Sequence, residues 1–530
     1  MTPLPERIVQ RFGKWRLAFL VFVITYTALL LLSLDYATPL WDEASHLIGG
    51  LLLNRGQIQD YTQQYMFYPP LFDSTIALSF MILGSSVFSA RLVAVTFGAL
   101  SIGAVFEYSY RLHGQRKALF SSVLLASMPG FIVLSRMVLI ETMLLFFFST
   151  SLFLFFLGVY IKNNKMLLLS GITIALGIIV KYQILIAGIV VFASLLLVLK
   201  GYVTKKFVKY FLIAIIAAAV VLLLVFFLVP DYIPGTLADW LYAIQVGTEE
   251  RSIYSERFPL SIFYFIEITY PYSHMHPISL PLYILGLFGL AFWLWRRRSE
   301  DKFSLIWFFA VYCVFTFIPN RNWRYVIPLF PILAMSASDF ILYIWDQIKN
   351  RLLAYKSSLR KTAMIKIIGI VFIMLIGASI VYSWRDAYSM VKDKQISIPT
   401  DEATRYVIEN SASTDAVVLF FTVNHFSIDI AKFYFSIYNS GERNTLEYPE
   451  KAPADAYTPV FNETFLIEYC NSNNVKYLLL YEYGNLTYFD SEWTFHYVLD
   501  MLIDSGKFIS EAVVGTSPDR IFIIRFISNP

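Results

Sequence analysis

The sequence predicts a polytopic α-helical membrane protein with a small external α/β domain at its C-terminal end. Of its 530 residues, 57% are hydrophobic and only 15% are charged, well below the ~25% charged residues of soluble domains. Many apolar runs approach the ~17–20 residues that cross a bilayer as a helix. The net charge of +4 is too small and dispersed to indicate a nucleic-acid partner.

Apolar length predicts about eleven transmembrane helices. The two segments on either side of Lys181 are short, and they could instead form one long bent helix. The expected segments are residues 16–34, 88–110, 117–134, 138–160, 166–180, 182–199, 208–229, 278–295, 303–319, 324–345 and 364–384.

Basic residues cluster in alternate connections between these segments, which orients the chain by the positive-inside rule. The N-terminus is then cytoplasmic, and residues 35–87, 230–277 and 385–530 are external, which predicts a multi-pass protein of the cell membrane. The basic residues before the first apolar run, without a convincing cleavage site, indicate an uncleaved signal anchor. The two cysteines, Cys313 and Cys470, exclude a disulfide framework.

The external segments contain the remaining predicted elements. In the first external loop, residues 43–54 and 71–84 are amphipathic and predict short interfacial helices. We expect a transmembrane domain over residues 1–384 and a soluble α/β domain over residues 385–530. In the latter, expected strands alternate with expected helices. The strands cover 416–421, 476–481 and 521–526, and the helices cover 400–410, 426–438, 461–472 and 491–505.

Charged residues gather on the predicted external face. Asp42 and Glu43 follow the first apolar run, Glu141 begins a helix, Lys181 separates two apolar segments, and Arg324 lies in a predicted turn. Each has a structural alternative: Asp42 as a helix N-cap, Glu141 on a helix dipole, Lys181 snorkelling and Arg324 as an interfacial anchor. Charges kept near a membrane tend to mark a functional site. We therefore expect them to share one external cavity that suits a phosphate and a reacting hydroxyl.

The order of these residues resembles the dolichyl-phosphate-mannose–protein mannosyltransferase family and its relative, the lipid A aminoarabinose transferase. Both are integral-membrane glycosyltransferases of the GT-C fold. The resemblance covers roughly residues 15–345. It is carried by Asp42-Glu43, Tyr68-Pro69-Pro70-Leu71, Phe88-Ser89-Ala90-Arg91-Leu92, Phe97-Gly98, Arg136 with Glu141, Gly177 to Lys181, and Arg324-Tyr325-Val326-Ile327-Pro328-Leu329-Phe330-Pro331.

The resemblance implies roles for the acids. Asp42 would be the general base, Glu43 its neighbour and Glu141 a second acid in the following external turn. These three carboxylates would also suit a divalent cation if Asp42 and Glu141 meet in space. The sequence therefore leaves metal dependence open.

The resemblance also implies which residues bind the donor phosphate. Lys181 and Arg324 would contact it, with Arg91 or Arg136 in support. The chain departs from the family at Tyr68, where relatives often carry Lys or His before Pro-Pro-Leu. A phenol can donate a hydrogen bond to phosphate but brings no charge. The positive charge that binds the phosphate would then come from Lys181 or an arginine.

Together these features predict an inverting, mannosyltransferase-like enzyme. It would move a monosaccharide from a polyprenyl-phosphate donor, such as a dolichyl phosphate, to an acceptor hydroxyl on a protein, lipid or glycan at the external membrane face. A transporter or flippase for a lipid-linked or anionic substrate is the main alternative, although no internal repeat is evident. A non-catalytic scaffold is a second alternative. An oligosaccharyltransferase is disfavoured because no Trp-Trp-Asp-Tyr-Gly stretch occurs.

Overall fold

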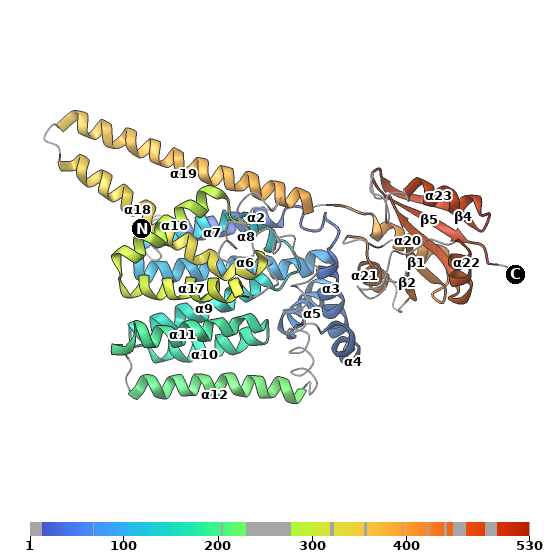
Figure 1. The fold of residues 1–530 in the computed structure, drawn as a ribbon, viewed down its shortest axis with the longest axis horizontal. Coiled ribbons are helices and arrows are strands. Elements are labelled where there is room, and N and C mark those ends of the chain that lie inside the picture. The colour runs from blue at the N-terminus through green and yellow to red at the C-terminus, as the bar shows by residue number, and fades with distance from the viewer. Residues whose placement is uncertain are drawn as a thin grey trace, which may run out of the picture. The chain divides into compact units, whose positions relative to one another are not determined.

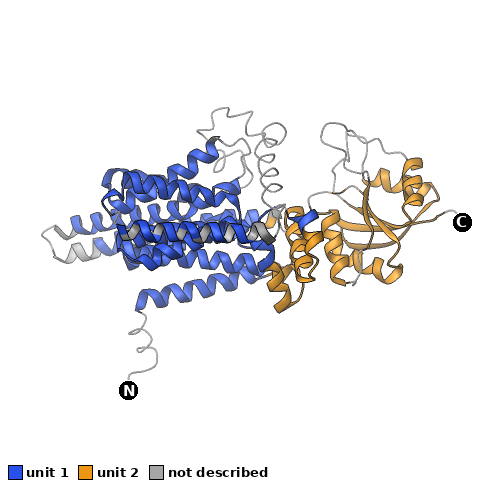
Figure 2. Cartoon of the chain, turned by 90° about the horizontal axis from the view of Figure 1, so that it is seen from below, with its two compact units in different colours: residues 1–32, 62–75, 91–391 blue, residues 33–61, 76–90, 392–530 orange. Residues whose placement is uncertain are grey.

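The computed structural model divides into two compact units (Figures 1 and 2). We call residues 1–32, 62–75 and 91–391 the helical unit, and residues 33–61, 76–90 and 392–530 the mixed unit. The predicted domain boundary after residue 384 stays a prediction. The structure describes residues 13–66, 68–202, 205–228, 277–317, 323–354, 358–394, 396–420, 422, 425–438, 443–448, 463–482 and 495–528.

Long helices form at all eleven predicted segments, and the third is broken into two. The break comes at Pro129, which lacks an N–H for a continuing helix and suits the first turn of a new one. The helices are α2 (Lys14–Leu31), α6 (Val87–His113), α7 (Gln115–Ala126), α8 (Pro129–Leu134), α9 (Glu141–Tyr160), α10 (Asn164–Ile178), α11 (Leu185–Leu197), α12 (Lys205–Leu228), α16 (Leu280–Arg296), α17 (Ser299–Phe317), α18 (Phe330–Ala354) and α19 (Ser358–Lys394).

Within the described ranges, five helical stretches are long and apolar enough to cross a membrane: α2, α6, α9, α19, and α18 with the preceding 3₁₀ helix η5 (Trp323–Leu329). Helices α10, α11 and α16 are apolar but shorter. Helix α9 is apolar around its whole circumference and mostly buried, so it forms the centre of the helical unit. The chain is a multi-pass membrane protein.

Small residues bring α16 and α18 together. A Cβ at Gly289 would lie 2.2 Å from the Ser336 backbone, so only glycine permits this approach. The Ser336 hydroxyl donates to the Gly286 carbonyl at 2.9 Å. Small residues and interhelical hydrogen bonds are the usual basis of helix packing in membranes.

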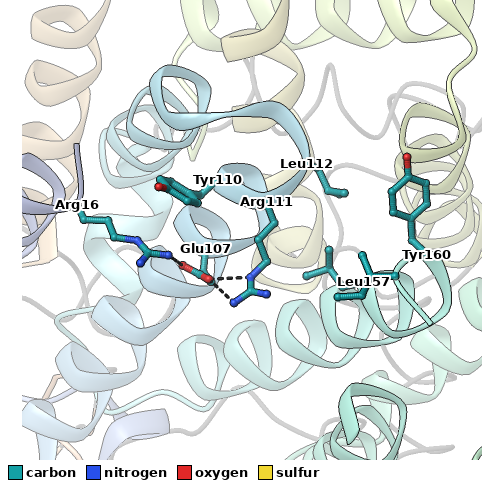
Figure 3. Close-up of a pocket in the computed structure, with 8 residues that line it drawn as sticks. Arg16, Glu107, Tyr110, Arg111, Leu112, Leu157 and Tyr160 are labelled. Carbon is teal, nitrogen blue, oxygen red and sulfur yellow. Dashed lines mark hydrogen bonds and ion pairs between the residues drawn. The ribbon is translucent and has the colours of Figure 1, made fainter. Parts of the chain in front are cut away.

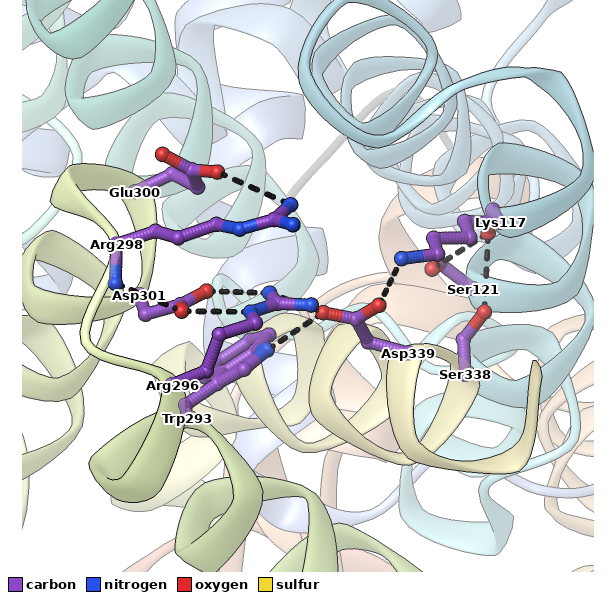
Figure 4. Close-up of polar contacts among 9 residues, drawn as sticks. All are labelled: Lys117, Ser121, Trp293, Arg296, Arg298, Glu300, Asp301, Ser338 and Asp339. Carbon is purple, nitrogen blue, oxygen red and sulfur yellow. Dashed lines mark hydrogen bonds and ion pairs between the residues drawn. The ribbon is translucent and has the colours of Figure 1, made fainter. Parts of the chain in front are cut away.

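A buried charge network joins α7, α16, α17 and α18 (Figure 4). The Asp339 carboxylate accepts from Lys117, from Arg296 and, at 2.9 Å, from the Trp293 indole N–H. Arg296 also donates to both oxygens of Asp301, at 2.5 and 2.8 Å. Four helices are thus tied together at one end of the unit.

The mixed unit contains a five-stranded sheet in the order β2-β1-β3-β5-β4, in which β1 is parallel to β2 and β3. Its strands are β1 (Ala416–Phe420), β2 (Thr445–Tyr448), β3 (Val475–Tyr481), β4 (Phe508–Thr516) and β5 (Asp519–Phe526). Its helices are α20 (Thr400–Asn410), α21 (Ile428–Tyr438), α22 (Glu463–Ser472) and α23 (Phe495–Asp504). Buried apolar clusters cover both faces of the sheet, and every strand and helix predicted here is present.

The first predicted external loop also forms the two expected helices, α3 (Trp41–Asn54) and α5 (Leu71–Leu83). Between them lie the short α4 (Ile58–Asp60) and a π-helical turn, η1 (Tyr61–Tyr65). Helix α3 belongs to the mixed unit, where it packs against α21. The Arg55 guanidinium, just after α3, donates to the Ser436 carbonyl of α21.

Candidate functional site

A buried ion pair lies at the start of α9. The Lys181 Nζ is 3.3 Å from Glu141 Oε1, and the two side chains are only 7% and 4% exposed. The other oxygen, Glu141 Oε2, is buried without a hydrogen-bond partner in the described part of the chain. Two predicted site residues, 40 positions apart, are thus in direct contact.

Lys181 lies in a tight turn between α10 and α11, so the alternative of one bent helix is wrong. Its backbone N–H donates to the Gly177 carbonyl at 3.0 Å. A Cβ at Gly177 would lie 2.8 Å from the Ile184 side chain and 3.3 Å from Phe147 of α9. The glycine therefore lets the end of α10 approach α9, and this approach brings Lys181 to Glu141.

Two tyrosine rings flank the Lys181 ammonium. Its Nζ lies 5.1 Å from the centre of the Tyr68 ring and 5.2 Å from that of Tyr325, within the range of cation–π attraction. The Leu71 N–H donates to the Ile179 carbonyl at 3.0 Å, which ties the Pro-Pro-Leu segment to the same turn. Tyr325 was not predicted as a site residue, although its place beside Arg324 in the motif was a usable signal.

The groups around Lys181 raise the pKa of its ammonium on balance. Burial lowers the pKa of the Lys181 ammonium, while the Glu141 carboxylate and the two tyrosines raise it by more, so the net shift is upward. Arg324, in η5, is close enough for its charge to act on both members of the pair. The structure therefore gathers Tyr68, Glu141, Lys181 and Arg324 in the helical unit.

The two supporting arginines lie in the same unit. Arg136 donates to the carbonyl oxygens of Leu30 and Leu32, the latter at 2.9 Å, and so binds groups that the end of α2 leaves without helical partners. Burial lowers the pKa of the Arg136 guanidinium, and the like charge of Arg91 lowers it further. Arg91 is buried in α6. Arg136 thus has a structural partner, and its predicted phosphate contact stays a prediction.

Asp42 and Glu43 occupy the first turn of α3 in the mixed unit. Glu43 is buried, and its Oε2 accepts the Leu40 N–H at 3.0 Å. Leu40 is the N-cap, so the alternative that Asp42 caps this helix is wrong. Asp42 is half-buried on the first turn. The two adjacent acids therefore differ in structural role, because the Glu43 carboxylate caps the N-terminus of the helix.

The predicted shared cavity stays a prediction, because Asp42 and Glu43 belong to the mixed unit and the other predicted site residues to the helical unit. Over the described ranges, no group of three or more His, Cys, Asp or Glu side chains could hold a metal ion.

A separate pocket of about 510 Å³ lies at the other end of α9 from Glu141 (Figure 3). There Glu107 pairs with Arg16 at 3.4 Å and with Arg111 at 2.7 Å. These groups are about 40% exposed, so the pairs contribute little to stability. Because a helix rises ~1.5 Å per residue, the 20 residues of α9 separate this pocket from the Lys181–Glu141 pair.

Comparison with known proteins identifies the fold. The sequence model of the family described as "Dolichyl-phosphate-mannose-protein mannosyltransferase" matches residues 68–228. An uncharacterised protein of Aquifex aeolicus (strain VF5) is 23% identical over 289 residues, which are 52% of each chain. The match thus spans about half the length of that curated relative.

Solved structures match over most of the chain. The crystal structure of ArnT from Cupriavidus metallidurans in the apo state has a TM-score of 0.63 at 14% identity, covering 96% of this chain and 98% of that one. The same protein bound to undecaprenyl phosphate gives 0.58 at 15% identity over the same shares. The archaeal oligosaccharyltransferase AglB from Archaeoglobus fulgidus, in complex with an inhibitory peptide and a dolichol-phosphate, gives 0.55 at 14% identity, covering 87% and 69%. The resemblance is therefore confirmed as one of fold: the chain is an integral-membrane protein with the GT-C fold of these solved structures, and the mannosyltransferase family model matches part of it.

Proposed function

We propose that the protein is a glycosyltransferase that moves a monosaccharide from a polyprenyl-phosphate donor to an acceptor hydroxyl on the external face of the membrane. One observation carries this proposal: the segment that matches the mannosyltransferase family contains a buried, incompletely partnered Lys181–Glu141 pair. The similar structures include complexes with undecaprenyl phosphate and with dolichol-phosphate, which supports a polyprenyl-phosphate donor.

The reaction would be a single displacement that inverts the anomeric carbon. The acceptor oxygen forms a bond to that carbon while the bond to the phosphate oxygen breaks, and the bonding electrons leave with the phosphate. Asp42 accepts the proton of the attacking hydroxyl. A general acid is unnecessary, because phosphate is already a good leaving group without being protonated.

The helical unit would supply the charge that stabilises the leaving phosphate. Lys181 acts as a point charge and Arg324 as a planar, bidentate donor. Glu141 and the rings of Tyr68 and Tyr325 hold the ammonium in place without donor bound. Because these groups are fixed before the reaction, little reorganisation accompanies the growth of negative charge on the phosphate.

The orientation follows from the same proposal. The N-terminus would be cytoplasmic and the mixed unit external, as the distribution of basic residues predicts. The donor's polyprenyl tail would lie among the helices, and the acceptor would be a protein, lipid or glycan.

The test measures transfer directly. Purified protein in lipid is incubated with radiolabelled polyprenyl-phosphate sugars and a membrane extract, and labelled product is counted. Asp42→Asn should lower the rate about 100-fold or more, and Lys181→Ala about 100–1000-fold. Asp35→Asn, in the same loop but exposed, is the matched control and should retain full activity. Transfer that survives Asp42→Asn would refute the base assignment, and no transfer from any donor would refute the proposal.

A further inference from the structure

Thr38, four residues before Asp42, makes three hydrogen bonds with the segment that leads into the α/β sheet. Its backbone N–H donates to the Ile396 carbonyl at 3.0 Å. Its hydroxyl donates to the Ile398 carbonyl at 3.0 Å and accepts the Ile398 N–H at 2.7 Å. Thr38 is 5% exposed, so these bonds are shielded from water. All these residues belong to the mixed unit.

The partner of Thr38 is itself fixed by the core of the α/β domain. Ile398 is 4% exposed and packs in the apolar cluster with Val417 and Leu419 of β1. His425, after β1, places its Nδ1 3.4 Å from the Thr38 carbonyl. The position of Thr38 is therefore set by the sheet rather than by its own loop.

Little conformational freedom remains between Thr38 and Asp42. Pro39 has a fixed φ, and the Leu40 N–H is bound by the Glu43 carboxylate. Helix α3 then begins at Trp41. A displacement of Thr38 must therefore move the first turn of α3, on which Asp42 lies.

The C-terminal end of α3 is also bonded to the C-terminal α/β domain. Arg55, after α3, donates to the Ser436 carbonyl of α21, and the rings of Phe80 in α5 and Phe433 in α21 are 6.3 Å apart. Both ends of α3 are thus bonded to elements of the C-terminal domain, one through Thr38 and the other through α21.

We propose that Thr38 is a positioning residue for Asp42, and that the C-terminal α/β domain serves to hold the entry to α3 in register for the reaction. This inference rests on the proposed function, because it assigns Asp42 as the base that is positioned. Thr38 itself need not touch the substrate. A misplacement of a reacting group by ~1 Å can cost about 100-fold in rate, so the hydroxyl should matter more to turnover than to donor binding.

The experiment compares Thr38→Val, which keeps the shape but removes the hydroxyl, with Thr38→Ser, which keeps the hydroxyl. Thr404→Val is the matched control, because Thr404 is also buried in the same unit but donates within its own helix, to the Asp401 carbonyl. We expect Thr38→Val to lower kcat about 10–100-fold with the donor KM within about twofold of wild type. Thr38→Ser should restore most of the rate, and Thr404→Val should leave it unchanged.

Hydrogen exchange separates this inference from the proposed function. In Thr38→Val, the amides of the first turn of α3 should exchange faster, whereas they should be unchanged in Thr404→Val. Faster exchange with an unchanged kcat would overturn the positioning role, and unchanged exchange would overturn the structural link itself. If the wild type transfers no sugar at all, the proposed function fails, and the exchange result still decides whether Thr38 fixes α3.

Discussion

Removing one member of the Lys181–Glu141 pair should destabilise the helical unit strongly. At 3.3 Å and an effective dielectric constant of about 20, the Coulomb attraction is about 5 kcal/mol. Lys181→Met leaves the Glu141 carboxylate at 4% exposure without its nearest cation, and breaking a buried pair in this way costs about 3–5 kcal/mol. Glu141→Gln should be comparably destabilising, because it leaves a buried ammonium beside Arg324.

The double variant should regain most of this stability, because no buried charge of the pair remains. The two single losses should therefore be far from additive. If each costs about 3–5 kcal/mol and the double variant little, the coupling between the substitutions should be about 5 kcal/mol or more. It is measured by denaturant titration of both single variants, the double variant and the wild type in detergent micelles. Sugar transfer, measured in parallel, should remain lost in the double variant, since the phosphate then lacks Lys181. Single variants as stable as the wild type, or a double variant with normal transfer, would refute this reasoning.

The other predictions concern charge networks away from the candidate site. Asp339→Asn should lower the free energy of unfolding by about 3 kcal/mol without changing the donor KM, because Arg296 and Lys117 lose their common charged acceptor. Arg298→Gln removes a side chain that is 58% exposed and should change the free energy of unfolding by no more than about 0.5 kcal/mol. Equal effects of the two substitutions would contradict this. Hydrogen bonds from Arg520 hold the pKa of the Glu482 carboxyl below its usual value. The pair therefore stabilises the mixed unit fully at pH values above the ordinary glutamate pKa of about 4.3. This stabilisation is lost as the pH falls through the lower pKa that Glu482 has in the folded protein. Arg520→Gln should remove this acid sensitivity in the exchange rates of β3 and β5, and an unaltered pH profile would count against it.

Apolar length predicts the helices well because crossing a membrane demands a long run of apolar residues whatever the helix packs against. The same rule does not predict the break at Pro129, which depends on a single residue. In the α/β sheet, the central strands β1, β3 and β5 were predicted, while β2 and β4 were not. Both missed strands lie at the sheet edges, and β4 is mostly exposed, so neither has the apolar run of a central strand.

The candidate site could be predicted in its composition but not in its pairing. Sequence order indicated that Lys181 and Glu141 are special, whereas their contact depends on Gly177 letting α10 approach α9. Arg136 was a plausible phosphate ligand by type, yet its first partners are backbone carbonyls at the end of α2. Thr38 was not predicted at all, because a threonine in a loop has no signal until its partner, 360 residues away, is known.

Among the described residues of the helical unit, two buried charge clusters differ in their hydrogen bonding. In the first, both oxygens of Asp339 and both oxygens of Asp301 accept hydrogen bonds from protein donors. In the second, Glu141 Oε2 has no hydrogen-bond partner among the described residues. A fully bonded network repays the cost of its burial and needs nothing further. An incompletely bonded carboxylate retains an unmet desolvation cost, which a hydroxyl-bearing substrate can lower by donating a hydrogen bond to it. For this reason we propose that the Asp339 network serves stability alone and that the Lys181–Glu141 pair also serves the reaction.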